Sequence, residues 1–176
     1  MAVNNTIVLL GKIGQLGWEL HRDLQPLGKV IALDYPQIDF TRPAEVLSLV
    51  ESLHPSLMIN AVAYTNVDKA ESEPELCDQI NFRAVEQLAQ LAARLRCGFV
   101  HISTDYVFDG TLSRPYTEEA PTHPLNHYGR SKLAGEQAVL ANTSAGWVLR
   151  TAWLYSRRAN DFVQRVLTWS RQQETL

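Results

Sequence analysis

Apolar segments of strand length alternate with helical patterns along the whole chain. The apolar segments, which we predict to be strands, cover residues 6–11, 29–34, 56–63, 99–108 and 146–155. The helical patterns cover residues 14–28, 41–55, 74–98, 128–142 and 160–176. Because parallel strands are joined by right-handed crossovers, this order predicts one α/β domain with a doubly wound parallel sheet and helices on both faces.

Composition narrows the classes of function. The 176 residues suit a single domain, and the net charge of -3 argues against a nucleic-acid-binding surface, which is usually basic. We see neither a secretion signal nor an apolar run as long as a membrane span. The two cysteines, Cys77 and Cys97, form neither a disulfide framework nor a metal cluster. We therefore expect a cytoplasmic protein with reduced thiols.

The carboxyl ends of the predicted strands are the places to look for a ligand, because doubly wound sheets bind ligands there. Three glycines follow the first strand at intervals of three residues: Gly11, Gly14 and Gly17. In a dinucleotide-binding turn of the Rossmann-like kind, one glycine permits the tight turn, a second lets the backbone approach a pyrophosphate, and a third lets the helix pack on the strand. The spacing differs from G-x-G-x-x-G, so a plain packing turn is the alternative.

Asp34 ends the second predicted strand, where a carboxylate would accept hydrogen bonds from the adenosine ribose of a dinucleotide. Its charge would repel the 2′-phosphate of NADP, which favours NAD. The neighbouring charges of Lys12, Asp39 and Arg42 leave both NADH and NADPH open. A solvated turn residue before Pro36 is the alternative interpretation.

Tyr128 and Lys132 lie four residues apart in a predicted helix and therefore share one face. A nearby ammonium lowers the pKa of a phenol, which makes tyrosine a usable general acid for a developing alkoxide. Ser103 and Thr104 end the preceding strand, where a hydroxyl would reach a carbonyl oxygen beside Tyr128. A Tyr–Lys pair alone is common on surfaces, but the order of glycine turn, strand-end hydroxyl and helical pair is much more specific.

Five segments carry a resemblance to a known family: GKIGQLGWEL (11–20), NAVAYTNVDKAESEPE (60–75), STDYVFDG (103–110), PLNHYGRSKLAGE (124–136) and RTAWLY (150–155). The chain resembles the extended short-chain dehydrogenase/reductases and, within them, the dTDP-4-dehydrorhamnose reductases. The resemblance spans nearly all of the chain. It implies NADPH- or NADH-dependent reduction of the 4-keto group of dTDP-4-dehydro-L-rhamnose to dTDP-L-rhamnose. Tyr64 is a departure, because many relatives have histidine there.

The resemblance also implies residue roles. Tyr128 would donate a proton to the keto oxygen, Lys132 would hold the nicotinamide ribose and lower the pKa of Tyr128, and Thr104 would orient the ketone. The cofactor would contact Gly11, Lys12, Gly14, Gln15, Leu16, Gly17, Asp34, Asp39, Phe40, Ala61, Val62, Ala63, Tyr64, Tyr128 and Lys132. The sugar would contact Val67, Thr104, Asp105, Tyr106 and Trp153. The alternatives are core packing for Trp153, an ordinary apolar loop residue for Val67 and a strand-end cap for Asp105.

Members of the family continue into a smaller sugar-nucleotide domain, which we expect to be absent from residues 1–176. We therefore expect cofactor binding, poor turnover of the sugar, and exposed apolar surface that includes Trp169. His101 and His127 are expected to be structural, no spacing supports a metal site, and a homodimer is an open expectation. Two other functions stay open: an NAD-retaining sugar-nucleotide epimerase or dehydratase, and a non-catalytic cofactor-binding partner subunit.

Overall fold

A computed structural model describes residues 5–156 and 162–172. Its sheet has five parallel strands in the order β2-β1-β3-β4-β5, which confirms the predicted doubly wound α/β fold. Their bounds are β1 Thr6–Leu10, β2 Lys29–Leu33, β3 Leu57–Asn60, β4 Gly98–Thr104 and β5 Gly146–Thr151. The order reverses direction at β1, so the first crossover runs one way along the sheet and the later ones run the other way.

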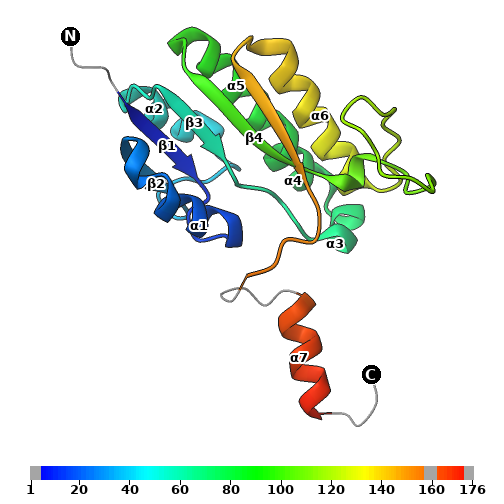
Figure 1. Cartoon of the computed structure of the whole chain (residues 1–176). Helices are drawn as coiled ribbons and strands as arrows, with labels where there is room; N and C mark the ends of the chain where they lie inside the picture. Colours follow the sequence, from blue (N-terminus) through cyan, green and yellow to red (C-terminus); the bar gives the residue numbers. More distant parts are fainter. Residues whose placement is uncertain (1–4, 157–161, 173–176) are drawn as a thin grey trace.

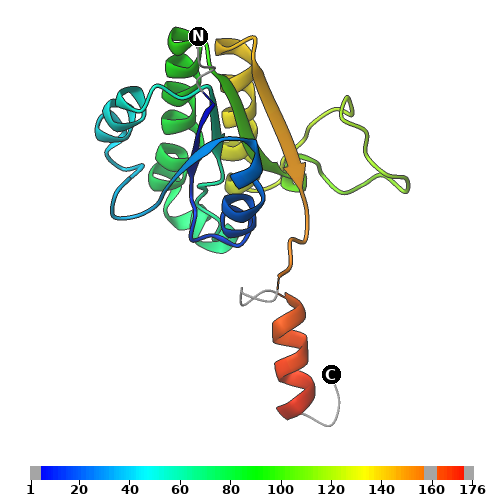
Figure 2. The same cartoon turned by 60° about the vertical axis from the view of Figure 1, so that its left-hand side comes forward.

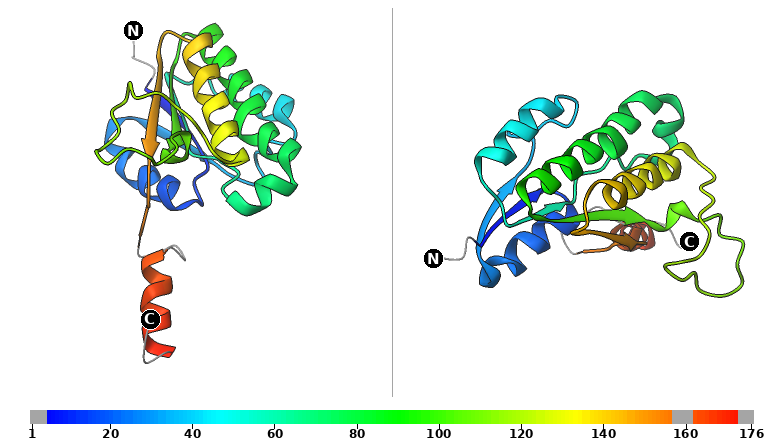
Figure 3. Two further views of the ribbon diagram at one scale, coloured as in Figure 1. Left: turned by 90° about the vertical axis from the view of Figure 1, so that its right-hand side faces the viewer. Right: turned by 90° about the horizontal axis from the view of Figure 1, so that it is seen from above.

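Helices cover both faces of this sheet (Figures 1 and 3). One face carries α2 (Pro43–Ser52), α5 (Ala84–Leu95) and α6 (His127–Asn142), and the opposite face carries α1 (Gln15–Asp23). Short helices α3 (Val67–Ser72) and α4 (Pro74–Asp78) precede α5. The last described helix, α7 (Phe162–Gln172), lies apart from the sheet (Figure 2).

Strand β1 is buried on both sides, as expected for the centre of a parallel sheet. Val8 and Leu10 belong to the larger core under α2, α5 and α6. Ile7 and Leu9 belong to the smaller core beneath α1. Because successive strand residues point to opposite faces, one continuous apolar run supplies both cores.

All five strands end earlier than predicted, three of them by three residues or more. We expected β3 to run to Ala63, β4 to Phe108 and β5 to Tyr155, but they end at Asn60, Thr104 and Thr151. At β4 the reason is local: the Thr104 hydroxyl accepts a hydrogen bond from Tyr106 N (3.2 Å), which turns the chain into a 3-10 helix, η3 (Asp105–Val107). Apolar character continued past the strand because Val107 is a core residue.

The predicted helix 74–98 is interrupted. A π-helical turn, η2 (Gln79–Arg83), separates α4 from α5, and α3 was not predicted. At the centre of η2 the fully buried Asn81 contacts another helix through Ser131. A widened turn of this kind is often found at functional sites.

Other helix bounds also changed. The predicted helix 14–28 ends at Asp23, followed by a 3-10 turn, η1 (Gln25–Leu27), and the helix predicted from Thr41 begins at Pro43 without a side-chain cap. Thr41 instead donates to Asp39 (2.6 Å). Residues 160, 161 and 173–176 of the last predicted helix lie outside the described residues.

The apolar side chains of α7 are not buried, and Trp169 is exposed as expected. Within the described ranges, no helix combines the length and apolar character needed to cross a membrane. Cys77 and Cys97 are buried free thiols.

Candidate active site at the carboxyl ends of the strands

A crevice of about 520 Å³ lies beyond the carboxyl ends of the central strands. This volume falls within the range of small-molecule and cofactor sites. It joins elements that are distant in sequence: the glycine turn after β1, the segment after β3, the end of β4, and helix α6. Eleven residues predicted to bind cofactor line it: Gly11, Gly14, Gln15, Leu16, Gly17, Asp34, Ala61, Val62, Ala63, Tyr128 and Lys132.

Glycine is favoured at each of the three positions of the turn for a different steric reason. Gly11 has φ +93°, a left-handed conformation that favours glycine, and its N–H donates to Leu33 O at 2.8 Å. A Cβ on Gly17 would lie 1.8 Å from Gly11 O, so only glycine lets α1 pack this close to the turn. A Cβ on Gly14 would meet nothing nearer than 3.5 Å, which leaves the crevice as the reason for its small size.

Asp34 lines the crevice and also braces the turn. One carboxylate oxygen accepts from Ile13 N at 2.7 Å and the other accepts from Tyr35 N at 2.8 Å. The carboxylate is therefore a turn brace that also borders the crevice, and its contact with a ribose stays a prediction.

Four residues predicted to bind cofactor do not line the crevice. The Phe40 side chain is buried in the larger core, and Asp39 accepts from Thr41 and lies 3.5 Å from Arg42. Lys12 Nζ donates to Gln37 at 3.4 Å.

Tyr64, the fourth, points its phenol to Glu73, and this hydrogen bond raises the pKa of Tyr64 to about 12. Its backbone is held by the Asn81 side chain, which accepts from Tyr64 N and donates to Tyr64 O. Asn81 thus fixes the end of the 61–64 segment beside the crevice. The sequence analysis did not identify Asn81 as a site residue, because it lies within an otherwise regular helical pattern.

The Thr104 hydroxyl is buried close to Tyr128. It donates to Asp105 Oδ1 at 3.1 Å. Burial raises the pKa of Tyr128, and a hydrogen bond with Thr104 opposes that rise. Tyr106 meets the Tyr128 ring edge-on, with centroids 5.6 Å apart. The phenol is therefore held in its neutral, proton-donating form.

Lys132 is fully buried, and its amine does not bond to Tyr128. Nζ donates to Ile102 O at 2.7 Å and lies 3.1 Å from His101 Nε2. Burial lowers the pKa of Lys132 to about 7, against the opposing charges of Glu136 and Cys77. The expected lowering of the tyrosine pKa by this lysine is therefore not present in this arrangement.

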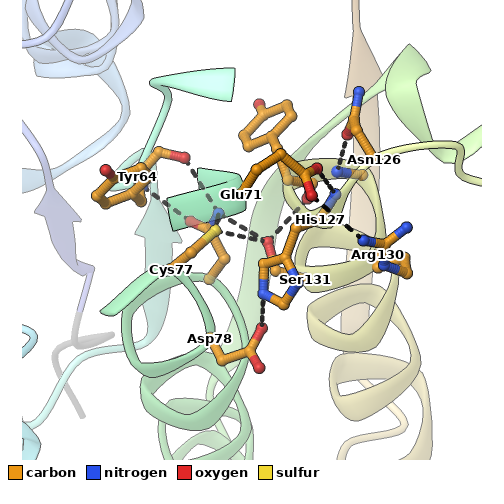
Figure 4. Close-up of polar contacts among 11 residues, drawn as sticks. Tyr64, Glu71, Cys77, Asp78, Asn126, His127, Arg130 and Ser131 are labelled. Atoms are coloured by element: carbon orange, nitrogen blue, oxygen red, sulfur yellow. Dashed lines mark hydrogen bonds and ion pairs between the residues drawn. The ribbon is translucent and has the colours of Figure 1, made fainter. Parts of the chain in front are cut away.

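A polar network fixes the start of α6, and with it Tyr128 (Figure 4). Asn126 caps the helix by accepting from Gly129 N at 2.7 Å. His127 N donates to Glu71 of α3 at 2.6 Å, and its ring Nε2 lies 2.9 Å from Asp78 of α4. His127 is thus structural, as predicted, and it joins α6 to the two short helices that the sequence pattern did not resolve.

A buried ion pair fixes the other half of α6. Glu136 is 2% exposed and accepts two hydrogen bonds from Arg150 of β5, at 2.6 and 2.9 Å. These bonds raise the pKa of Arg150. The pair lies one helical turn beyond Lys132, so its charge also acts on the amine.

The residues predicted to bind the sugar do not all lie together in the structure. Asp105 and Tyr106 lie beside Thr104 in η3, next to a second cavity of about 310 Å³. Val67 begins α3 and is half-buried. Trp153 is 76% exposed and contacts only the ring of Phe162 among the aromatic pairs of the described chain.

The crevice suits a dinucleotide. Among the described residues, two buried polar side-chain atoms lack a hydrogen-bond partner, Gln15 Nε2 and Ser103 Oγ, and both residues line it. Together with the backbone left bare by Gly14, they offer polar groups to a ligand with phosphates and hydroxyls. In the described segments, no cluster of three or more His, Cys, Asp or Glu side chains is arranged to hold a metal ion.

The chain is similar to a family of known proteins. The family model described as RmlD substrate binding domain matches residues 5–176. The dTDP-4-dehydrorhamnose reductase of Salmonella typhimurium is 45% identical over 174 residues, which cover 97% of this chain and 58% of that protein. The dTDP-4-dehydrorhamnose reductase of Burkholderia thailandensis is 44% identical over 171 residues, covering 97% and 57%. This chain thus spans somewhat more than half the length of these relatives.

Solved structures show the same fold. The dTDP-4-dehydrorhamnose reductase of Bacillus anthracis in complex with NADP matches with a TM-score of 0.92 and 33% identity, over 98% of this chain and 62% of that one. The ortholog from Clostridium acetobutylicum matches with a TM-score of 0.91 and 36% identity, over 96% and 60%.

Proposed function

We propose that this chain, which belongs to the RmlD substrate binding domain family, is the cofactor-binding part of an NAD(P)H-dependent reductase that converts dTDP-4-dehydro-L-rhamnose to dTDP-L-rhamnose. The single observation that supports it best is the crevice in which the glycine turn, Tyr128 and Lys132 meet. Residues 1–176 form the dinucleotide-binding domain in this proposal. The remaining length of the relatives supplies contacts to the sugar nucleotide, and the protein acts in the cytoplasm.

The cofactor is held along the crevice. The turn at Gly11–Gly17 and the N-terminus of α1 face the pyrophosphate, and Asp34 accepts from the adenosine ribose. Ala61–Ala63 line the path to the nicotinamide, where Lys132 holds the second ribose. When bound, the cofactor supplies hydride to C4 of the sugar. The NADP complex of the Bacillus anthracis reductase supports NADPH as a cofactor of this chain.

Proton transfer is assigned to Tyr128. Its phenol, kept neutral by burial, donates to the keto oxygen as negative charge develops there. Thr104, beside it, turns its single hydroxyl proton from Asp105 to the ketone and so orients the ketone. The sugar side of the crevice is proposed to be formed by Asp105, Tyr106, Val67 and Trp153. Trp153 is exposed in this chain, so a further protein surface is needed to hold it against the substrate.

The test is Tyr128→Phe, compared with Tyr155→Phe, which removes a hydroxyl from an exposed ring. With dTDP-4-keto-6-deoxysugar and NADPH, Tyr128→Phe is expected to lower kcat by about 10²- to 10⁴-fold while the Kd for NADPH stays within about twofold. If the parent chain has too little turnover to measure, the same pair is made in a chain extended to the length of the relatives. Equal rates for both variants would refute the assignment.

Two further measurements separate the rival functions. Purification with stoichiometric, tightly held NAD would favour an epimerase or dehydratase. Cofactor binding without reduction, even in the extended chain, would favour a non-catalytic partner subunit. Light scattering tests the expected homodimer.

A further inference from the structure

A chain of buried polar side chains lies behind the crevice and crosses three elements. Asn60 ends β3, His101 lies on the adjacent strand β4, and Lys132 lies on α6, which covers that strand (Figure 1). All three are at most 1% exposed. Asn60 Nδ2 lies 3.2 Å from His101 Nδ1, and His101 Nε2 lies 3.1 Å from Lys132 Nζ. Buried polar groups of this kind are costly unless each hydrogen bond has the right donor and acceptor.

The backbone decides which way the Asn60 amide faces. Val62 N donates to Asn60 Oδ1 at 3.0 Å, so the amide NH₂ is turned towards His101. An amide NH₂ only donates, and His101 Nδ1 must therefore accept. A neutral imidazole that accepts at Nδ1 carries its proton on Nε2.

The proton on Nε2 then points at Lys132 Nζ. An ammonium has three donors and no acceptor, so it would face this N–H with no lone pair to offer. An uncharged amine has one lone pair, which accepts from His101, and it still donates to Ile102 O at 2.7 Å. The geometry satisfies every member of the chain only when Lys132 is uncharged.

We propose that Asn60 and His101 form a positioning relay for Lys132: Asn60 sets His101 in its Nε2–H form, and His101 holds the lysine as an uncharged amine until the cofactor ribose draws it into the crevice as an ammonium. This deepens the proposed function and rests on it for the role of Lys132 in cofactor binding. The arrangement of protons inside the relay is independent of that function.

The charges around the amine agree with the relay. Burial lowers the pKa of Lys132 to about 7, and Glu136 on α6 and Cys77 on α4 oppose this effect. Burial, and the charge of Lys132 whenever it is protonated, hold the pKa of His101 well below its usual range, so the imidazole stays neutral. Arg150 of β5 partly offsets the charge of Glu136, to which it is bonded, and Tyr128 is neutral.

The relay makes cofactor binding depend on pH. Above pH 7 the amine is uncharged in the free protein, so forming the ammonium in the complex takes up one proton. Affinity then falls by up to about tenfold for each pH unit above 7. Below pH 7 the free amine already carries its proton and the dependence fades.

The first test is direct and needs no cofactor. Long-range ¹H–¹⁵N correlation spectra of histidine-labelled protein distinguish the two tautomers, and His101→Gln identifies the His101 signals. The expected result is an Nε2–H imidazole at pH 8, where Lys132 is uncharged, and no doubly protonated ring between pH 6 and 8. An Nδ1–H form, or a doubly protonated ring at pH 7, would overturn the relay.

The second test uses Asn60→Asp, which reverses the donor and acceptor roles of the two His101 ring nitrogens. The new carboxylate still accepts from Val62 N and now also accepts from His101 Nδ1–H, which leaves Nε2 free to accept from a lysine ammonium. The tautomer should switch, and the fall in NADH affinity between pH 7 and 9, measured by fluorescence titration, should disappear. Asn142→Asp at the far end of α6 adds the same charge and should keep the wild-type slope.

Each outcome has one meaning. A wild-type affinity that is flat from pH 7 to 9 would overturn the step in which the ribose draws Lys132 out of the relay as an ammonium, and an Nδ1–H tautomer would overturn the proton arrangement itself. If the tautomer and the slope are as expected but Tyr128→Phe keeps full turnover, the relay stands and the proposed reaction fails.

Discussion

Gly17→Ala tests whether the glycine turn is built for packing or for ligand. The added Cβ would lie 1.8 Å from Gly11 O and 2.7 Å from Gly11 C, and both atoms belong to the backbone. Ordinary van der Waals contact begins near 3.4 Å, so helix α1 and the turn must separate by about 1.6 Å. A flexible side chain cannot absorb this displacement, because the neighbours are backbone atoms.

The cost follows from that displacement. Overpacking a well-packed site costs about 1–3 kcal/mol, and the upper end applies where backbone meets backbone. For a chain of this size, about 3 kcal/mol lowers the Tm by roughly 6–12 °C. The shift also displaces the N-terminus of α1, so NADPH affinity should fall together with stability.

Gly14→Ala is the matched control. Its Cβ would contact nothing nearer than 3.5 Å, and its φ of -60° and ψ of 159° suit any residue, so the stability cost is only that of replacing the glycine N-cap of α1 by alanine, about 0.5–1 kcal/mol. Its methyl group would enter the crevice, so the Kd for NADPH should still rise by about tenfold or more. Thermal unfolding and fluorescence titration measure both quantities. A Gly17→Ala protein that unfolds at the wild-type temperature would refute the packing argument.

Three other perturbations test the surroundings of the site. Glu136→Gln leaves Arg150 without its buried charged partner and should cost about 3 kcal/mol in urea unfolding, whereas an unchanged midpoint would contradict the role given to the pair. Hydrogen bonding from Tyr116 lowers the pKa of Asp109 to about 2, so the stability that this carboxylate contributes is present above its usual pKa and is lost as pH falls towards 2. In Tyr116→Phe, NMR titration of the carboxyl group should show a higher pKa for Asp109. No rise in this pKa would count against the hydrogen bond. Asp34→Asn removes one negative charge from the proposed ribose position and should raise the NADPH-to-NADH affinity ratio by about fivefold, and a ratio that falls would show that the carboxylate does not face the 2′ position.

Local patterns predicted the sheet and the position of the crevice. Residues 7–10 of β1 are apolar at every position, as a strand buried on both faces requires, and Gly17 is required by its close contact with Gly11 in the same turn. Tyr128 and Lys132 were found because four-residue spacing on a helix is also local. The fold was therefore predictable from neighbouring residues alone.

The ends of strands and helices were harder to predict from the sequence. The break at Asn81 depends on a bond to Ser131, fifty positions away in the chain, and the end of β4 depends on a side-chain turn at Thr104 that apolar patterning does not report. Phe40 and Tyr64 were assigned to the cofactor by resemblance, but the structure turns their side chains to the core and to Glu73.

The sequence by itself determined that a parallel sheet would end in a glycine turn facing a helical Tyr–Lys pair, because those features arise from spacing along one strand or one helix. Only the tertiary structure decided which groups the lysine amine meets. His101 lies 31 positions from Lys132 and Asn60 lies 41 positions from His101, and packing β3, β4 and α6 together excludes water from all three. Without water as an alternative partner, the direction of each hydrogen bond, and with it the charge of Lys132, is set by its buried neighbours.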